Sequence, residues 1–200
     1  MEEVYQKVFE GLVRRIRRYN QSMDVALLRK AFEFSYEAHR NQLRKSGHKY
    51  FEHPLEVAKI LTGLKMDYET IAAAILHDVA EDTEYNIARV ESEFGHSIAS
   101  LVDGVTKISD IKLLEFEERQ AENFRKMLLS MVKDIRVIII KFADRLHNMR
   151  TLEFLPEKKR RRIALATREV YAPLAHRLGL AKIKWELEDL ALKFLEPEIY

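Results

Sequence analysis

Apolar residues recur along most of this chain at the three- and four-residue spacing of an amphipathic helix. Near the N-terminus, Val4, Val8, Leu12 and Ile16 form such a stripe beside a basic face. The same spacing predicts further helices from the caps Ser22 and Asp24 to about Arg40, from Pro54, after Asp67, and over 87–94, 97–105, 116–133, 136–155, 156–178 and 181–195. Since only six Gly and four Pro interrupt these stripes, the pattern predicts an all-α fold, one domain of about ten helices.

Two segments do not follow the helical pattern clearly. Residues 137–140 are β-branched in succession, which is typical of a buried strand. We nevertheless predict a helix there, because Phe142, Leu146 and Met149 continue the apolar stripe without a breaker. Residues 107–119 have mixed polarity and no clear period, and we predict that this segment is flexible.

Charge and residue types narrow the functional classes. The 34 basic and 32 acidic residues nearly balance, so net charge argues neither for nor against a polyanionic partner. The absence of Cys excludes disulfides, zinc–thiolate sites and thiol catalysis. No stretch is apolar for long enough to span a membrane, and the acidic start at Glu2 and Glu3 is unlike a signal peptide. We expect a soluble cytoplasmic protein.

The strongest chemical signal is an alanine-rich apolar helix that leads into His77, Asp78, Glu81 and Asp82. Buried charge is costly unless it is paired or coordinates a metal. We therefore predict that this stretch forms half of a metal site. A single histidine is more often structural, but His53 stands just before a proline, a residue favoured at the first helical position, and so at the mouth of a helix.

A second candidate group lies in the apolar stretch after residue 141. Asp144, Asn148 and Thr151 share one face of the expected helix. This arrangement favours Asp144 as the missing acidic ligand. The alternative is a surface ion pair between Asp144 and Arg145 or Lys141.

Two basic segments are candidates for anion binding. The polar loop after the second helix holds Arg44, Lys45, Ser46 and Tyr50, a set that suits a phosphate and a stacked base. A mobile surface loop is the alternative. The basic run at 158–162 is better interpreted as a solvated helix face, because no aromatic residues are interleaved to stack on nucleic-acid bases.

Four ordered blocks together resemble the hydrolase domain of the RelA/SpoT (Rel) family, within the HD superfamily of metal-dependent phosphohydrolases. The blocks are Arg44–Gly47, His53–Leu55, His77–Thr83 and Asp144–Thr151, and the resemblance covers essentially the whole chain. Enzymes of that family make and degrade the stringent-response alarmone (p)ppGpp. The resemblance implies an HD-type helical domain over 1–195 that hydrolyses the 3′-pyrophosphate of (p)ppGpp to GDP or GTP and pyrophosphate.

The resemblance also implies a metal cofactor. One Mn²⁺ would be held by residues matching His53, His77, Asp78 and Asp144. Two imidazoles and two carboxylates suit a borderline divalent ion, although these donors alone do not exclude Fe²⁺, Co²⁺ or Zn²⁺.

Catalytic and nucleotide-binding roles follow from the same resemblance. Glu81 and Asp82 match an acidic pair that positions or deprotonates the attacking water and handles the proton of the leaving group. Arg44 would neutralise charge that develops on the pyrophosphate. The other expected nucleotide contacts are Lys45, Ser46, Tyr50, Asn148 and Thr151.

Two further features bear on this expectation. His48 and Lys49 stand where many members carry an acid and a proline. Residues 196–200 resemble the start of a connection to a synthetase domain, so we expect an N-terminal fragment of a long bifunctional enzyme, without synthetase or regulatory domains. Two alternatives stay open: an HD phosphohydrolase for another nucleotide, or a non-catalytic module that binds nucleotide or nucleic acid. We expect no membrane association and no direct nucleic-acid binding from this chain.

Overall fold

The computed structural model describes residues 2–110 and 133–200. These residues form helices joined by short loops, with no β-strand among them, which confirms the predicted all-α class. They fall into two compact units, Met1–Lys107 and Ile108–Tyr200. The predicted helix at 116–133 lies outside the described residues for all but its last position. The domain bounds 1–195 and 196–200 stay predictions.

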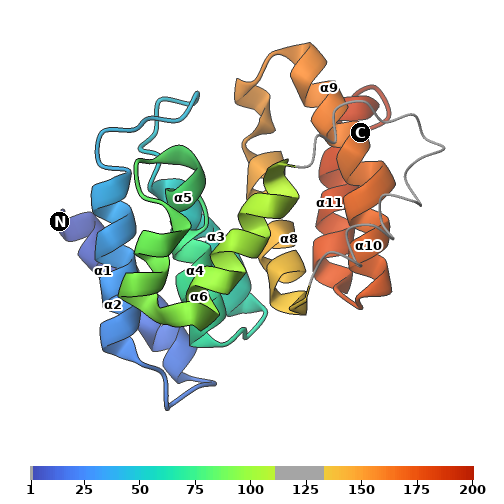
Figure 1. Cartoon of the computed structure of the whole chain (residues 1–200). Helices are drawn as coiled ribbons and strands as arrows, with labels where there is room; N and C mark the ends of the chain where they lie inside the picture. Colours follow the sequence, from blue (N-terminus) through green and yellow to red (C-terminus); the bar gives the residue numbers. More distant parts are fainter. Residues whose placement is uncertain (1, 111–132) are drawn as a thin grey trace. The chain divides into compact units, whose positions relative to one another are not determined.

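The first unit contains most of the residues predicted to form the site, and Figure 1 labels its helices. Its helices are α1 (Glu3–Arg17), α2 (Val25–Ala38), α3 (Glu52–Gly63), α4 (Tyr68–Leu76), the short α5 (Val79–Asp82) and α6 (Ile87–Asp110), which begins in this unit. The centre of the unit is α4, which packs against both α2 and α3. Its residues from Ile71 to Leu76 are fully buried. The polar residues that directly follow α4, beginning with His77, therefore lie next to the core of this unit.

Side-chain caps and one glycine set the helix ends in this unit. The Oδ1 atoms of Asp24 and Asp67 accept hydrogen bonds from the backbone N–H groups three residues later, each at 2.9 Å. Ser22 bonds to Asn20 instead, so Asp24 is the cap of α2. Gly95 interrupts α6 with a φ of 81°, which confirms the predicted break.

The expected bounds of α3 and of the end of α6 are wrong. We expected α3 to begin at Pro54, but it begins at Glu52, so His53 lies inside the first turn. Proline is tolerated there because the first N–H groups of a helix have no partner within the helix. The second part of α6 continues to Asp110, so residues 107–110 are helical rather than irregular. Residues 111–119 of the segment predicted to be flexible lie outside the described residues.

An aromatic cluster joins α1, α2 and the start of α3. Phe32 packs edge-on against Phe9 at 5.1 Å and against Phe51 at 5.0 Å between ring centroids. Tyr5 meets Phe51 in the same way at 5.3 Å. Edge-to-face pairs of this kind stabilise beyond the area that they bury. Because Phe51 lies between Tyr50 and His53, the cluster fixes the backbone that carries both of these site residues.

The second unit includes α8 (Ile135–Arg150), α9 (Glu157–Ala166), α10 (Ala172–Arg177) and α11 (Ala181–Leu195). Residues 137–140 are helical, as predicted, and Asp134 caps α8 by accepting from the N–H of Arg136. The predicted continuation of this helix to Leu155 is wrong. The helix ends at Arg150, and a separate 3₁₀ turn (η3, Leu152–Phe154) follows.

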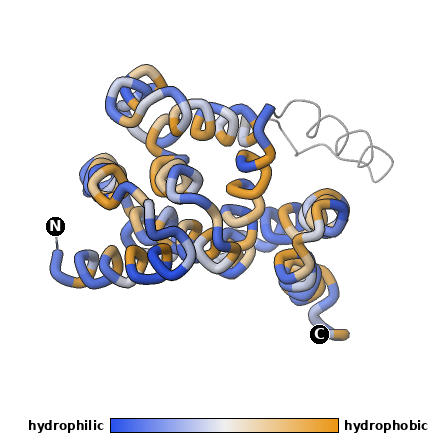
Figure 2. The backbone as a smooth tube through the Cα atoms, turned by 90° about the horizontal axis from the view of Figure 1, so that it is seen from below, coloured by the Kyte–Doolittle hydropathy of each residue, from blue (hydrophilic) through white to orange (hydrophobic). Residues whose placement is uncertain are grey.

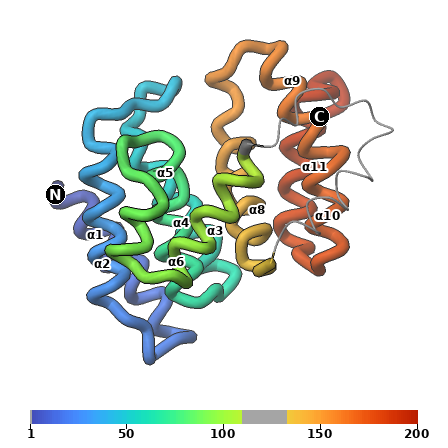
Figure 3. The backbone as a smooth tube through the Cα atoms, viewed as in Figure 1, coloured from blue at the N-terminus to red at the C-terminus, as the bar shows by residue number. Residues whose placement is uncertain are grey.

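Figure 2 colours the backbone by hydropathy and shows apolar and polar positions mixed along the helices, and Figure 3 shows the order of the helices along the chain. In the second unit, α11 packs against α8, α9 and α10 through its buried side. A π-helical turn (η4, Thr167–Tyr171) precedes Pro173. Proline cannot donate and crowds the carbonyl four residues earlier, and a wider turn relieves both problems. Gly179, at a φ of 71°, ends α10 as predicted. Among the described residues, no helix combines the length and apolar character needed to cross a membrane.

Candidate metal centre

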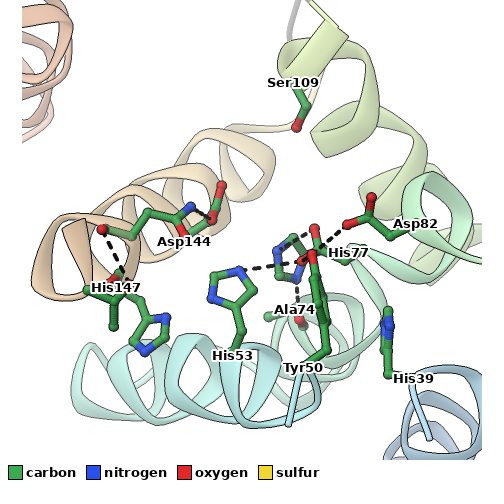
Figure 4. A network of polar contacts seen from close by, with 12 residues as sticks. His39, Tyr50, His53, Ala74, His77, Asp82, Ser109, Asp144 and His147 are labelled. Atoms are coloured by element: carbon green, nitrogen blue, oxygen red, sulfur yellow. Dashed lines mark hydrogen bonds and ion pairs between the residues drawn. The ribbon is translucent and has the colours of Figure 1, made fainter. Parts of the chain in front are cut away.

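His77 and Asp78 lie in the turn between α4 and α5, at the end of the most buried helix of the first unit. The Nδ1 of His77 lies 2.7 Å from the carbonyl oxygen of Ala74 (Figure 4). A carbonyl only accepts, so Nδ1 carries the proton and Nε2 presents a lone pair in the neutral ring. Metal-bound histidines are oriented by this type of hydrogen bond. The His77 side chain is almost fully buried, so neighbouring atoms also restrict the orientation of its ring.

Asp78 lies between two imidazoles. Its Oδ1 is 3.0 Å from Nε2 of His77, and its Oδ2 is 3.4 Å from Nε2 of His53. The ring centroids of the histidines are 5.2 Å apart, and their candidate ligand atoms lie within 4.8 Å of each other. A lone pair on Nε2 of His77 would repel the Asp78 carboxylate unless a proton or a cation lies between them. Two imidazoles and a carboxylate, mostly buried, therefore fit a divalent metal ion.

Tyr50 connects this cluster to the acidic turn that follows it. Its hydroxyl lies 2.9 Å from Oδ2 of Asp78 and also contacts Oδ2 of Asp82. Burial, together with the carboxylates of Asp78 and Asp82, raises the pKa of Tyr50 above its usual value. The phenol therefore stays protonated and donates its single proton to one carboxylate at a time. We had expected Tyr50 to contact the nucleotide, which stays a prediction, but its hydroxyl contact to the two acids was not foreseen.

Glu81 and Asp82 lie on α5, one turn beyond the histidine–aspartate pair, and both are exposed. The N–H of Asp82 donates to the carbonyl of Asp78 at 2.8 Å, which sets the start of the turn. The hydroxyl of Thr83 donates to the carbonyl of Val79 at 2.6 Å and closes it. The two acids therefore stand close to the candidate metal ligands while keeping access to water. Their catalytic roles stay predictions.

The predicted phosphate loop is a tight turn. The N–H of Arg44 donates to the carbonyl of His48, and the N–H of Gly47 donates to the carbonyl of Arg44, each at 2.9 Å. Gly47 has a φ of 82°, which a glycine adopts without strain. Lys45 is exposed, while Arg44 and Ser46 are partly buried. The backbone thus holds these side chains on one short turn, but their contacts with a nucleotide stay predictions.

The two unusual loop residues contact neighbouring acids. His48 lies 3.2 Å from Glu52, and Lys49 contacts Glu2. Neither is among the residues proposed to bind metal or substrate. These departures from the common family pattern therefore leave the candidate cluster unchanged.

Asp144 lies on α8 in the second unit and is buried. Its Oδ2 is 2.6 Å from Nζ of Lys141, and its Oδ1 accepts from Nδ2 of Asn148 at 2.5 Å. Lys141 also donates to Oγ of Ser109 at 2.8 Å. The pair of Asp144 with Lys141 was our alternative to a site role, but both side chains are buried, so it is not a surface pair.

The electrostatics of this pair are governed by burial and attraction together. Burial acts to lower the pKa of Lys141, but the attraction and hydrogen bond of Asp144, together with Tyr171, raise that pKa above its usual value. Lys141 therefore stays a cation beside the Asp144 carboxyl group. Thr151, at the end of α8, donates to the carbonyl of His147 at 3.2 Å. The ligand role of Asp144 and the substrate roles of Asn148 and Thr151 stay predictions.

Sequence reasoning missed the residues that support the cluster. His39 stacks on Tyr50 and Gln42 bonds to the backbone of Asp82, whereas Lys141 was considered only as a surface partner of Asp144 and pairs with it in a buried position. The only sequence signal for the first two was a histidine and a glutamine three residues apart at the end of a helix. That pattern alone does not indicate a role, because the role depends on how the loop after α2 brings Tyr50 and Asp82 to these residues.

Comparisons with known proteins agree on the family to which this chain is similar. A family described as the HD domain matches residues 31–181. The chain is 55% identical over 174 residues to a probable guanosine-3′,5′-bis(diphosphate) 3′-pyrophosphohydrolase of Synechocystis, which covers 87% of this chain and 23% of that protein. It is 51% identical over 193 residues to the bifunctional (p)ppGpp synthase/hydrolase SpoT of Escherichia coli K12, covering 96% of this chain and 28% of that protein.

A solved structure agrees with these matches. It is described as a metazoan orthologue of SpoT that hydrolyses ppGpp, with a TM-score of 0.65 and 30% identity, covering 82% of this chain and 93% of its own. The chain spans about a quarter of the length of the curated relatives that it matches. With the match to most of its length, the chain belongs to the HD domain family and, within it, to the RelA/SpoT group.

Proposed function

We propose that this chain hydrolyses the 3′-pyrophosphate of (p)ppGpp and releases pyrophosphate with GDP or GTP. The observation that carries the proposal is the contact of Asp78 with Nε2 of both His53 and His77, in a ring orientation set by Ala74. The names of its relatives support the choice of substrate. We also propose that residues 196–200 lead into a synthetase domain and that the protein acts in the cytoplasm.

We assign Mn²⁺ as the metal, held by His53, His77, Asp78 and Asp144. Mixed nitrogen and oxygen donors suit such a borderline ion. Asp144 joins the set because it is a buried carboxylate within an apolar helix, and one of its oxygens is already oriented by Asn148. When bound, the ion supplies a Lewis acid that activates water and polarises a phosphoryl oxygen.

The chain's own residues then have separate tasks. In the reaction, the water oxygen bonds to the phosphorus next to the ribose, the bond from that phosphorus to O3′ breaks, and O3′ leaves with a proton. Glu81 accepts the proton of the attacking water, and Asp82 assists in orienting the water and returning a proton to O3′. Tyr50 restricts the rotation of Asp78 and Asp82 by its hydroxyl.

Substrate binding falls to the loop and to α8. The planar guanidinium of Arg44 suits bidentate contact with the pyrophosphate. Lys45 and Ser46 add a charge and a hydroxyl from the same turn. Asn148 and Thr151 bind sugar or phosphate from the end of α8, which they reach because they follow Asp144 along one helix face.

The proposal is tested by incubating the purified chain with ppGpp and Mn²⁺ and measuring pyrophosphate release. We expect release by the wild type, and none after chelation or with His77→Ala. His96→Ala is a matched control, because the His96 side chain is 86% exposed and contacts Glu91, five residues earlier in the chain.

The same assay separates the alternatives. Equal release by His77→Ala would exclude the metal site. Faster hydrolysis of another nucleotide in a substrate panel would favour a different HD phosphohydrolase. Nucleotide binding that survives chelation, without turnover, would favour a regulatory module.

A further inference from the structure

His39 is buried beside the candidate site without a role in the proposed chemistry. It follows α2 as its C-cap and is 1% exposed. Its Nδ1 lies 2.7 Å from Oε1 of Gln42, while its Nε2 has no hydrogen-bond partner among the described residues. A buried ring nitrogen without a hydrogen-bond partner lowers the stability of the folded protein. Hydrogen bonding alone therefore does not explain a histidine at this position.

The ring of His39 lies face to face with the ring of Tyr50, as Figure 4 shows. Their centroids are 4.8 Å apart and the planes differ by 19°. His53 approaches Tyr50 edge-on at 6.2 Å. The stack covers one face of Tyr50 and directs its hydroxyl at Asp78 and Asp82.

Gln42 links the same group to the backbone of the acidic turn. Its Nε2 donates to the carbonyl of Asp82 at 2.6 Å, while its Oε1 faces Nδ1 of His39. Its backbone N–H donates to the carbonyl of His39, and its carbonyl accepts from the N–H of Tyr50. One amide orientation satisfies both side-chain contacts, with the Nδ1–H of His39 as donor.

Two independent contacts therefore converge on Asp82. Gln42 holds its backbone and Tyr50 holds its carboxylate, and His39 supports both. Asp82 has an exposed side chain on a helix of only four residues, so these contacts are what restrict it. Such a side chain samples several rotamers, and a catalytic acid works best when its geometry is fixed beforehand.

We propose that His39 and Gln42 are positioning residues for the Asp82 carboxylate and act on turnover through Tyr50 and the α5 turn. This inference rests on the proposed hydrolase function. It extends the site beyond its ligands to the end of α2 and the loop that follows.

Two variants test the proposal in the full chain loaded with Mn²⁺. Gln42→Met keeps the side-chain length and removes both hydrogen bonds. His39→Phe keeps an aromatic ring to stack on Tyr50 and removes the Nδ1–H. We expect each variant to lower kcat for pyrophosphate release by about 10- to 100-fold, with KM and Mn²⁺ affinity changed by less than about threefold. His96→Ala, far along α6 and exposed, should keep the wild-type kcat.

A double-mutant cycle distinguishes positioning from general damage to the fold. If Gln42 acts through Asp82, Gln42→Met should cost little further turnover in an Asp82→Asn background. The same fold-loss in both backgrounds would overturn the proposal. Wild-type kcat in both single variants would also overturn it.

A measurement without catalysis keeps the inference separate from the proposed function. In the metal-free protein, we expect the amide of Asp82 to exchange its hydrogen at least about tenfold faster in Gln42→Met than in the wild type. Unchanged exchange would contradict the inference even if both variants were slow enzymes. Absence of pyrophosphate release by the wild type would instead contradict the hydrolase function. The hydrogen-exchange rates of Asp82 would still test whether Gln42 positions the α5 turn.

Discussion

The Nδ1 of His77 donates to the carbonyl of Ala74 across a single helical turn, at 2.7 Å. This bond ties the imidazole to the last turn of α4, whose residues are fully buried. The Nε2 is then directed at Asp78, 3.0 Å away. A fully buried helix thus sets the orientation of a candidate metal ligand, and a ligand oriented in advance loses little freedom when a cation binds.

Replacing Glu81 by Gln separates catalysis from metal binding. The amide keeps the size of the side chain but cannot accept a proton from water. We expect turnover of ppGpp to fall by about 10²- to 10⁴-fold, the usual contribution of a general base. Calorimetric titration should show Mn²⁺ affinity within about twofold of the wild type. Loss of the metal in this variant would identify Glu81 as a ligand and refute its assigned role.

Lys141→Met tests whether Asp144 depends on a buried counter-charge. Lys141 and Asp144 form an ion pair whose side chains are 12% and 6% exposed. Removing one partner leaves a buried charge without its neutralising group, and we expect the metal-free protein to lose about 3 kcal/mol of unfolding free energy. Denaturant titration measures the loss.

A divalent ion bound by Asp144 should offset part of the Lys141→Met defect. We therefore expect saturating Mn²⁺ to raise the stability of the variant more than that of the wild type. Lys184→Met is a matched control, since Lys184 makes an ion pair with Glu188 along the surface of α11. An equal gain in wild type and Lys141→Met would count against Asp144 as a ligand.

Gly95→Ala tests the break inside α6. Gly95 has a φ of 81°, and a methyl group there would meet no neighbouring atom within 4 Å. The cost therefore comes from the backbone alone, and we expect a loss of about 1 kcal/mol in unfolding free energy. Gly11→Ala, in the interior of α1 and equally unobstructed, should stabilise by up to about 1 kcal/mol. The two substitutions should thus shift the denaturation midpoint in opposite directions; a shift in the same direction would contradict this assignment.

Asp134 should make stability depend on pH. Its hydrogen bonds with the Arg136 side chain lower the pKa of Asp134 below its usual value, although burial acts in the opposite direction. An acid with a lowered pKa stabilises the folded state above its unfolded pKa, and this contribution is lost as pH falls through the folded pKa. Asp134→Asn keeps an N-cap group but removes the charge.

We therefore expect Asp134→Asn to be less stable than the wild type at about pH 7, and the difference to shrink as pH falls below about 3.8. Thermal melting at several pH values measures it. A difference that is constant or grows on acidification would contradict a stabilising contribution from the Asp134 charge.

The helices were predictable from sequence because their signals are local. Asp24, Asp67 and Gly179 act within a few residues, and each ends or begins a helix as expected. The helix at 137–140 was predictable because the apolar period outweighs β-branched propensity. The π turn was not predictable, because Pro173 allows a break, a kink or a wider turn, and packing decides among them.

The candidate site was predictable only in part. Its chemical residues stand in recognisable blocks, and the contacts of His53, His77 and Asp78 are consistent with the prediction of a metal site. The support from His39 and Gln42 was not predictable. His39 contacts Tyr50, 11 residues away in sequence, and Gln42 contacts Asp82, 40 residues away. No local sequence pattern predicts contacts over such separations.

The most direct test of the account is a crystal structure of the chain soaked in Mn²⁺, with anomalous diffraction used to locate the ion. We predict one strong peak, bonded to Nε2 of His53 and His77 and to carboxylate oxygens of Asp78 and Asp144, at about 2.0–2.3 Å. A peak that lacks His77, or a structure in which Asp144 stands more than about 12 Å from His53, would contradict the proposed metal centre.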